Sequence, residues 1–212
     1  MKKVGLMLLA CLVLSGCTAV RIDTKDINNM VSVILSKDNK LYNHVGKGYK
    51  YYVPRGVTYI DTNEFNEKLY SNGNYYYLYV DAVSYYYKKD LDYKVNKDAY
   101  YSKKFDVDGK TAYLEITKSE KINKYFIEFM YNYARIETLV DKEDINDAVM
   151  NASYILSTVK FNPNVIKLML NEDYFINKEE NYDEFTSEKS DVETDNFLQY
   201  SDQDNEKKKE EK

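Results

Sequence analysis

The chain has 212 residues, a length that allows one ordinary domain with extra segments at its ends. Its composition is that of a globular protein, although it contains 24 Tyr and no Trp and most of its basic residues are Lys. The net charge of −5 is uneven, because residues 171–212 hold 15 acidic residues against 6 Lys while the body is close to neutral. A near-neutral body lacks the basic surface of a nucleic-acid-binding protein, so no nucleic acid partner is expected.

The N-terminus combines a basic start with a short apolar run. Lys2 and Lys3 precede the apolar segment 4–14, which is too short to cross a hydrocarbon core of about 30 Å as a helix. The run ends in Leu14-Ser15-Gly16-Cys17. This ending resembles the bacterial lipobox, in which an apolar residue and two small residues precede a cysteine that is alkylated with diacylglycerol. A simple secretory signal and an uncleaved anchor are the alternatives.

The lipobox resemblance implies a processed and anchored protein. Residues 1–16 would be the lipoprotein signal peptide, which carries Cys11 away, and Cys17 would be the first mature residue and the site of lipidation. Two acyl chains on one residue satisfy the two-signal requirement for stable anchoring. We therefore expect a lipoprotein on the extracytoplasmic face of the cell membrane of a low-GC, Gram-positive-type bacterium. Its mature form has no free thiol, which excludes disulfides and cysteine-based catalysis.

Three further segments follow the signal peptide in this interpretation. Residues 17–40 form the lipid-anchored N-terminus and a first helix, residues 41–170 an α+β globular domain, and residues 171–212 an acidic tail. The tail has excess charge and scattered aromatic residues without a period, which predicts disorder. A short docking motif within the tail is the alternative.

The first helix is predicted from its hydrophobic periodicity. Thr24 can cap it, and apolar residues then recur at i, i+3, i+4, i+7 and i+8. These residues are Ile27, Met30, Val31, Ile34 and Leu35. The stripe could pack on the domain or lie in the membrane interface. The polar face holds few Lys or Arg, which favours packing.

Segments with strand periodicity fill the middle of the chain. They are 49–57, 74–89, 99–107, 111–117 and 124–140. Pro54 ends the first of them and Gly56 suits the turn that follows. Short connections between such strands predict an antiparallel meander, because parallel crossovers need a dozen or more residues.

Some details of this sheet are also predicted. Asp108-Gly109 suits a hairpin between two of the strands, and a bulge or bend near Asn132 would reconcile the two parities of the last strand. In the segment 74–89, Leu78, Val80 and Ala82 are expected on one face. Residues 62–74 could be a short helix or an irregular strand.

A long amphipathic helix follows the last strand. Asp141 can cap it and Pro163 marks its exit. Its apolar stripe consists of Ile145, Ala148, Val149, Ala152, Ile155, Leu156 and Val159. A first helix and this helix laid on an antiparallel meander make an α+β sandwich.

The order of elements resembles the PsbP-like fold. The matching pieces are "YYVPRGV" at 51–57, where the family has a strand ending in a turn, and "ASYILSTVKFN" at 152–162, where a long helix runs into a short strand. Known members of that fold are mostly protein-binding modules. The resemblance therefore implies an interaction domain.

A search for catalytic chemistry finds little in this chain. His44 is the only histidine and has no neighbouring Cys or His in the sequence, so it is a poor metal ligand or general base. Glu115 and Glu128 could form the carboxylate pair of a hydrolase on adjacent strands, although exposed cross-strand charges explain them more simply. "DVDGKT" at 106–111 favours a hairpin turn over a calcium loop. We expect no catalytic residue, no metal and no cofactor.

The remaining candidate site is a row of tyrosines. If a helix covers the face with Leu78, then Tyr75, Tyr77, Tyr79 and Tyr113 share the opposite face. Tyrosine rings with polar tips suit a protein interface or sugar stacking, and the lack of Trp favours a protein partner. The rings could instead pack against one another or under a loop, and a low-GC genome enriches Tyr without any function.

The sequence thus predicts a non-catalytic lipoprotein that binds another envelope or membrane protein. A ligand- or glycan-binding lipoprotein that uses the same rings is the alternative, and a hydrolase is the third hypothesis. The oligomeric state is left open.

Overall fold

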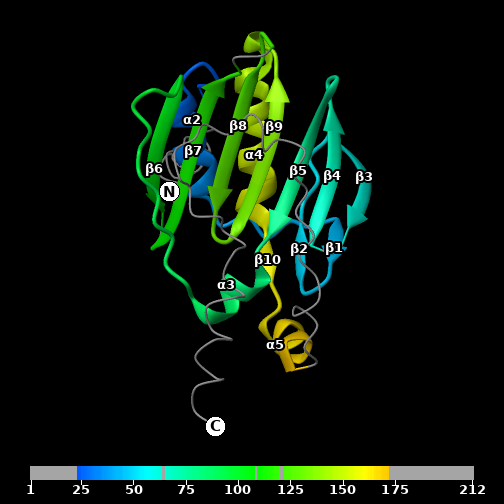
Figure 1. The fold of residues 1–212 in the computed structure, drawn as a ribbon. Coiled ribbons are helices and arrows are strands. Elements are labelled where there is room, and N and C mark those ends of the chain that lie inside the picture. Colours follow the sequence, from blue (N-terminus) through cyan, green and yellow to red (C-terminus); the bar gives the residue numbers. More distant parts are fainter. Residues whose placement is uncertain (1–22, 64, 108, 120–121, 172–212) are drawn as a thin grey trace, which may run out of the picture.

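The computed structural model describes residues 23–63, 65–107, 109–119 and 122–171 (Figure 1). Along the chain its elements are α2 (Ile27–Leu35), β1 (His44–Gly46), β2 (Tyr49–Tyr51), β3 (Thr58–Asn63), β4 (Asn66–Ser71), β5 (Asn74–Val80), α3 (Ala82–Tyr87), β6 (Tyr101–Val107), β7 (Lys110–Lys118), β8 (Tyr125–Tyr131), β9 (Ala134–Val140), the 3-10 turn η1 (Lys142–Asp144), α4 (Ile145–Thr158), β10 (Lys160–Phe161) and α5 (Pro163–Asn171).

The main layer is a seven-stranded antiparallel sheet in the order β3-β4-β5-β9-β8-β7-β6. The prediction of an antiparallel α+β fold is confirmed, but the prediction of one continuous meander is wrong. β5 pairs with β9 rather than with the next strand, so two meanders, β3–β5 and β6–β9, join along this seam. At the seam Leu78 lies directly opposite Ile136, which places two buried apolar side chains side by side.

A second, three-stranded sheet has the order β1-β2-β10. The predicted strand 49–57 belongs to this sheet, but only its first three residues, Tyr49–Tyr51, form a strand, β2. The predicted turn follows, with Gly56 at a φ of 86° and a hydrogen bond of 3.1 Å from the Val57 N–H to the Pro54 carbonyl. β10 pairs with β2 through Lys160 and Phe161, so the chain after α4 closes this small sheet.

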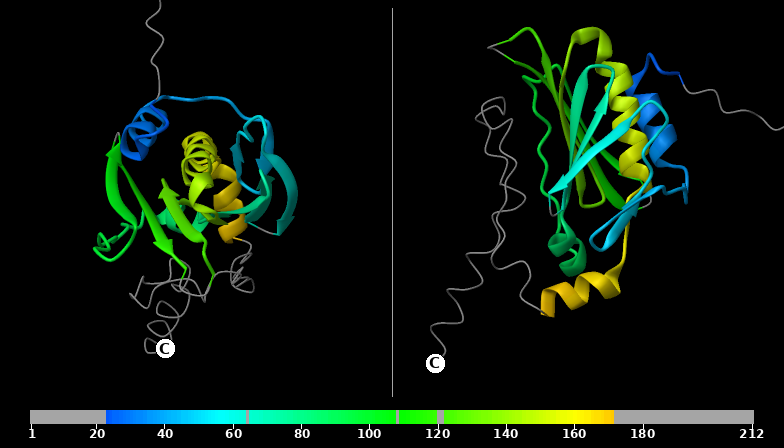
Figure 2. Two further views of the ribbon diagram at one scale, coloured as in Figure 1. Left: turned by 90° about the horizontal axis from the view of Figure 1, so that it is seen from above. Right: turned by 90° about the vertical axis from the view of Figure 1, so that its right-hand side faces the viewer.

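Both predicted amphipathic helices pack on one face of the large sheet, which we call the inner face. α4 crosses β8 and β9, and α2 lies beside α4 near β6 (Figure 2). All seven residues of the predicted α4 stripe are buried, and so are Met30, Val31, Ile34 and Leu35 of α2. The preference for packing over an interfacial position of the first helix is therefore confirmed. The small sheet lies on the same side of the large sheet as these helices (Figure 2).

The predicted strand 74–89 is a strand only in its first half. β5 ends at Val80, and Ala82–Tyr87 form the short helix α3, so Ala82 does not continue the face of Leu78. Asp81 explains the change, because its carboxylate accepts a hydrogen bond of 2.7 Å from the Ser84 N–H and caps the helix. The strand therefore stops at Asp81, because the Asp81 side chain bonds to a nearby backbone N–H group and favours a helix start over a continued strand.

Asp81 gives a first testable prediction. Its side chain is buried, one carboxylate oxygen (Oδ2) has no hydrogen-bond partner, and burial raises its pKa. A raised pKa means that the group supports folding below its unfolded pKa and costs stability as pH rises through the folded value. Asp81→Asn keeps a capping side chain without the charge, so it should raise the free energy of unfolding by about 1 kcal/mol at pH 7.

The measurement is urea unfolding at pH 7 and at pH 3. The gain of Asp81→Asn should disappear at pH 3, where the wild-type carboxyl is also neutral. Asp81→Ala serves as the control, because it loses the cap and should be less stable than Asp81→Asn at both pH values. An equal gain at pH 3 and pH 7 would show that the buried charge is not its cause.

The bend predicted near Asn132 is a hairpin turn, at which the chain reverses its direction. Asn132 and Tyr133 have positive φ values of 50° and 64° and form the two-residue turn between β8 and β9. Such φ values are typical of type I′ hairpins, although Tyr is an unusual residue there. The segment 124–140 is therefore two strands, which accounts for its change of parity without a bulge.

The predicted helix ends also need correction. Asp26, not Thr24, caps α2 by accepting a hydrogen bond of 3.2 Å from the Asn29 N–H. Asp141 precedes the 3-10 turn η1 and makes no side-chain capping bond. Pro163 begins α5, which the sequence did not predict, in the first helical position that suits proline.

The undecided segment 62–74 is β-structure, and β4 occupies most of it. The hairpin around Gly109 is confirmed by the pairing of Val107 with Lys110. In the part of the chain that the structure describes, no helix combines the length and hydrophobicity needed to cross a membrane. The predicted signal peptide, Cys17 and the tail beyond Asn171 lie outside the described residues and stay predictions.

Candidate functional site

The four predicted tyrosines lie on one face of the large sheet, opposite α2 and α4, which we call the outer face. Along β5, Tyr75, Tyr77 and Tyr79 alternate with inner-face residues of the core. Tyr113 of β7 reaches the same face, because the cross-strand row through Met130 and Arg135 connects it to Tyr79. The shared face is as predicted, and the binding role of these residues stays a prediction.

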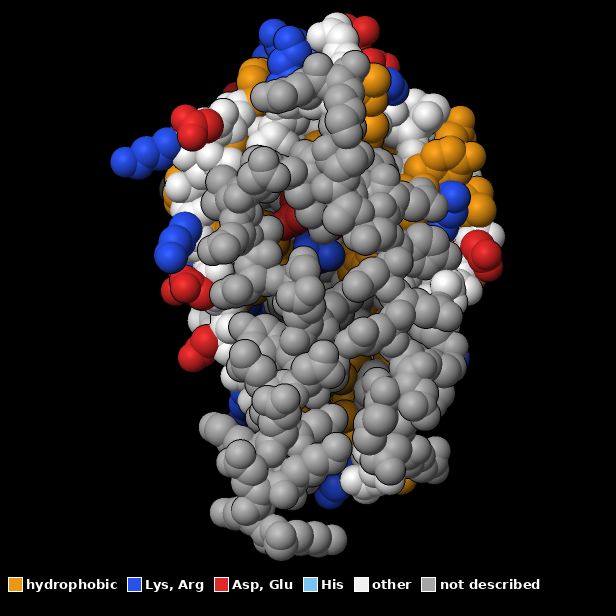
Figure 3. Space-filling view, in the orientation of Figure 1, with side chains coloured by type: hydrophobic (Ala, Val, Ile, Leu, Met, Phe, Trp, Pro, Cys, Tyr) orange, Lys and Arg blue, Asp and Glu red, His pale blue; other side chains and the backbone are white. Residues whose placement is uncertain are grey.

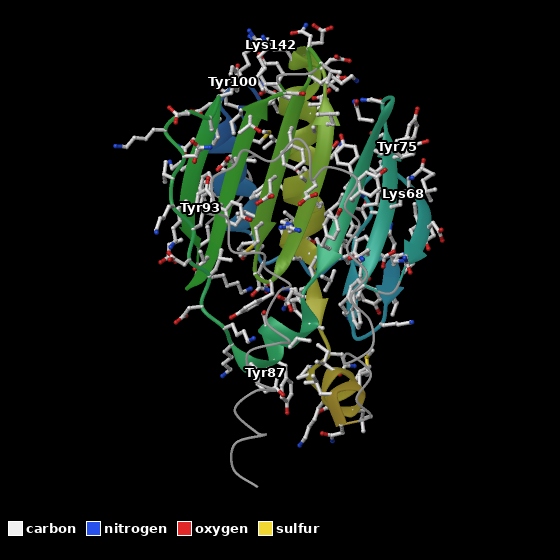
Figure 4. All side chains as sticks on the ribbon, viewed as in Figure 1. Lys68, Tyr75, Tyr87, Tyr93, Tyr100 and Lys142 are labelled. Carbon is white, nitrogen blue, oxygen red and sulfur yellow. The ribbon has the colours of Figure 1, made fainter. Side chains whose placement is uncertain are left out.

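The four rings differ in accessibility. Tyr75 is 46% exposed, whereas Tyr77, Tyr79 and Tyr113 are buried. Tyr93, which Figure 4 labels, lies in the connection between α3 and β6. Its ring covers Tyr113 and stacks on that ring with centroids 4.0 Å apart and an angle of 4°. The exposure of the row, which the sequence left open, therefore differs from ring to ring, and of these four residues only Tyr75 can offer its ring directly.

A row of three glutamates crosses the outer face beside these rings. Glu115 lies directly opposite Glu128, and Glu128 directly opposite Glu137. Like charges opposite each other destabilise a sheet unless other groups compensate them. The predicted pair on adjacent strands thus exists, with a third carboxylate next to it.

Hydrogen bonds hold the carboxylates of Glu115 and Glu128. Glu115 accepts from the Tyr93 hydroxyl at 2.6 Å and from the Asn96 side chain at 2.9 Å. Glu128 accepts from the Tyr113 hydroxyl at 2.5 Å. Burial, together with the charge of Glu128, raises the pKa of Tyr113 well above its ordinary value, so this hydroxyl stays a donor.

Arg135 supplies the positive charge of this network. Its guanidinium lies 3.2 Å from Glu137 and 3.9 Å from Glu128, and it stacks over the Tyr79 ring at 5.0 Å. Burial alone would lower the pKa of Arg135, but the carboxylates of Glu137 and Glu128 outweigh it and raise the pKa. Arg135 and the three glutamates thus form one network beside the tyrosines. In this network each carboxylate accepts a hydrogen bond or forms an ion pair.

Glu137 was not considered from the sequence, and Arg135 was expected only as a cation near exposed cross-strand charges. The turn at Asn132 was interpreted as a bend, so the outer-face parity of β9 was not assigned. A hairpin at that turn would have placed both residues beside Glu128.

The accessible part of the outer face lies over β4 and β5. Tyr70 and Tyr75 are cross-strand neighbours with ring centroids 5.2 Å apart and tilted by 57°, and the Lys68 ammonium lies 4.7 Å from the Tyr75 ring centre. Figure 3 shows hydrophobic side chains with a Lys beside them at this edge, and Figure 4 labels Tyr75 and Lys68 there. We call Lys68, Tyr70 and Tyr75 the tyrosine patch.

His44 has a partner that the sequence did not reveal. Its Nε2 lies 3.5 Å from the carboxylate of Glu67, a buried residue that points from β4 to the inner face. Glu67 also accepts hydrogen bonds of 2.5 Å from the Tyr49 and Thr62 hydroxyls. Burial and the charge of Glu67 raise the pKa of Tyr49, which therefore stays a donor. The two hydroxyl donors satisfy the buried carboxylate of Glu67. Through these hydrogen bonds, Glu67 connects β2 of the small sheet to β3 and β4.

Among the described residues, no three Asp, Glu, His or Cys side chains come together as metal ligands would. No protein-family model matches the chain. No curated protein matches it either. The site must therefore be interpreted from its own residues.

Proposed function

We propose that the protein is a lipoprotein, anchored by diacylglycerol at Cys17 on the extracytoplasmic face of the membrane, whose domain binds another envelope or membrane protein without catalysis. The observation that carries the binding role is the tyrosine patch. Its two tyrosines are exposed. The patch lies on the face of the large sheet opposite α2 and α4, and it combines two aromatic rings with a half-buried lysine. Tyr is among the residues that contribute most to protein interfaces.

Two properties of the patch favour a protein over a sugar. The rings of Tyr70 and Tyr75 are tilted by 57° against each other, so they do not form one flat platform on which a sugar ring could stack. The ionic network around Arg135 lies on β9, the strand that pairs with β5. Tyrosine side chains have few rotatable bonds, so ordering them on binding a protein costs little entropy.

The resemblance to the PsbP-like fold supports the same proposal. An antiparallel sheet carries the long helix α4, which runs into the short strand β10, and β2 leads into the turn at Pro54. This is the order of elements on which the proposed resemblance depends. We therefore propose a PsbP-like sandwich, a fold whose known members mostly bind proteins.

The test is capture of the partner by a chemical crosslinker in cells, with the double variant Tyr70→Ala/Tyr75→Ala. Because truncating interface anchors commonly costs 2 kcal/mol or more, the yield of the crosslinked complex should fall by at least about tenfold. Tyr87→Ala is the matched control, since Tyr87 is an exposed tyrosine on α3 at another end of the domain (Figure 4). Equal yields from the double variant and the control would contradict the proposal, and capture of wall glycan alone would favour the glycan-binding alternative.

A further inference from the structure

The small sheet has an outward-facing row of its own. Val45 lies opposite Lys50, and Lys50 lies opposite Lys160, across all three strands. Tyr49 and Tyr51, which flank Lys50 in β2, are buried in the core, so Lys50 points away from it. The row therefore combines one aliphatic and two cationic side chains on the surface.

The segment that leads into β1 enlarges this surface. Leu41, Tyr42 and Val45 are 59%, 53% and 68% exposed. The Lys50 ammonium stacks over the Tyr42 ring at 3.8 Å. Lys40 and Lys160 both contact the carboxylate of Asp38 at 3.5 Å, which holds the segment against β10. We call the following residues the basic–apolar surface: Lys40, Leu41, Tyr42, Val45, Lys50 and Lys160.

This surface lies within reach of the proposed anchor. The described chain begins at Asp23, six residues after Cys17, and six extended residues span at most about 21 Å. α2 follows and measures about 14 Å, and its end leads directly to Asp38 and Lys40. α2 and the small sheet lie on the same side of the large sheet, opposite its outer face (Figure 2).

We propose that the basic–apolar surface rests on the anionic headgroups of the membrane to which the lipid holds the protein. The proposal relies on the anchoring part of the proposed function and adds a second membrane contact to it. Its chemistry is that of an interfacial contact, because lysines attract anionic lipids while exposed aliphatic and aromatic side chains enter the headgroup boundary. Docked in this way, the domain turns the outer face and its tyrosine patch away from the bilayer.

Charge complementarity favours the membrane over a neutral partner. Lys40, Lys50 and Lys160 carry three positive charges, and Asp38 offsets one of them. The acidic segment 172–212 of the same chain is a second possible occupant, and an acidic protein is a third. The experiment treats these as outcomes that overturn the proposal.

A single tryptophan provides a direct probe, because the chain has none. The unacylated mature chain 17–212 carrying Cys17→Ser and Leu41→Trp contains every described element. Mixed with vesicles of phosphatidylglycerol and phosphatidylcholine, it should show a blue-shifted and stronger tryptophan emission, and no change with phosphatidylcholine alone. The control Ile122→Trp, in the exposed loop between β7 and β8, should show no shift. Shifts of equal size at both positions would overturn the proposal.

A charge-matched pair of triple variants tests the lysines. Lys40→Gln/Lys50→Gln/Lys160→Gln should weaken binding to the anionic vesicles by at least about tenfold. Lys97→Gln/Lys118→Gln/Lys142→Gln removes three charges from exposed lysines elsewhere and should leave binding within about twofold. Equal losses would show that net charge alone drives the binding, which would overturn the proposal.

The occupants are separated by one more variant. Vesicle binding that appears only after residues 172–212 are removed would show that the acidic segment occupies the surface in the full chain. If the chain does not bind anionic vesicles either with or without residues 172–212, an acidic protein is the remaining occupant of the surface. Both results would overturn the proposal. Because the chain used is unacylated, neither result depends on whether Cys17 is lipidated in cells.

Discussion

Replacing Cys17 with Ser is expected to abolish lipid labelling of the protein and to leave its signal peptide uncleaved. The physical reason is that only a thiol at this position can be alkylated with diacylglycerol in the proposed lipobox Leu14-Ser15-Gly16-Cys17. The measurement is metabolic labelling with a fatty acid analogue, followed by the mass of the mature chain. The effect should be complete, because no second cysteine lies after residue 17.

Cys11→Ser is the matched control for this prediction. It removes the other cysteine of the chain, which lies inside the apolar segment that we propose to be discarded. Its labelling and processing should equal those of the wild type. Normal lipid labelling of the Cys17→Ser protein, or its loss in Cys11→Ser, would refute the assignment of Cys17.

Replacing Arg135 with Met is expected to destabilise the domain by about 3–5 kcal/mol, the typical cost of leaving buried charges without a partner. The loss should be large because Arg135 is the cation that contacts both Glu128 and Glu137. Met fills a similar volume, which keeps the packing term small. Urea unfolding at pH 7 measures the change in the free energy of unfolding.

Two comparisons isolate the electrostatic origin of this loss. Lys104→Met removes a charge from an exposed lysine of β6, opposite Tyr113, and should change the stability by less than about 0.5 kcal/mol. Adding Glu137→Gln to Arg135→Met should recover part of the deficit, because one buried charge fewer is then left without a partner. A deficit that is the same with and without Glu137→Gln would point to packing instead of charge.

The parts of the fold that were predicted correctly depend on local patterns. The stripe from Ile145 to Val159 repeats at the helical period, and every member is buried against the sheet. The alternation in β5 placed Tyr75, Tyr77 and Tyr79 on one face and the core residues on the other. These patterns follow from burial on one side of an element, which a sequence records directly.

The parts that were missed depend on contacts between distant residues. The pairing of Leu78 with Ile136 spans more than fifty positions, and no local pattern specifies it. The helix α3 replaces a tyrosine-rich strand because one carboxylate, Asp81, caps it. β-propensity could not reveal that competition.

The candidate site shows the same division. Its face was predictable from alternation, but the burial of Tyr113 was not, because Tyr93 covers it from a connection of irregular structure. Glu67 was missed for a related reason. Its strand was undecided, and its partners Tyr49 and Thr62 come from two other strands. The exposure of a side chain and its charged partners are decided only when the sheets assemble, so the sequence of one strand does not predict them.

The central claim is that an anchored domain presents the tyrosine patch to another protein. Photo-crosslinking in cells tests it most directly, with a photoreactive residue placed at Tyr75 or, as the control, at Tyr87. We expect discrete protein adducts from Tyr75 and none of that size from Tyr87. The absence of protein adducts at Tyr75, or the same adducts at both positions, would contradict it.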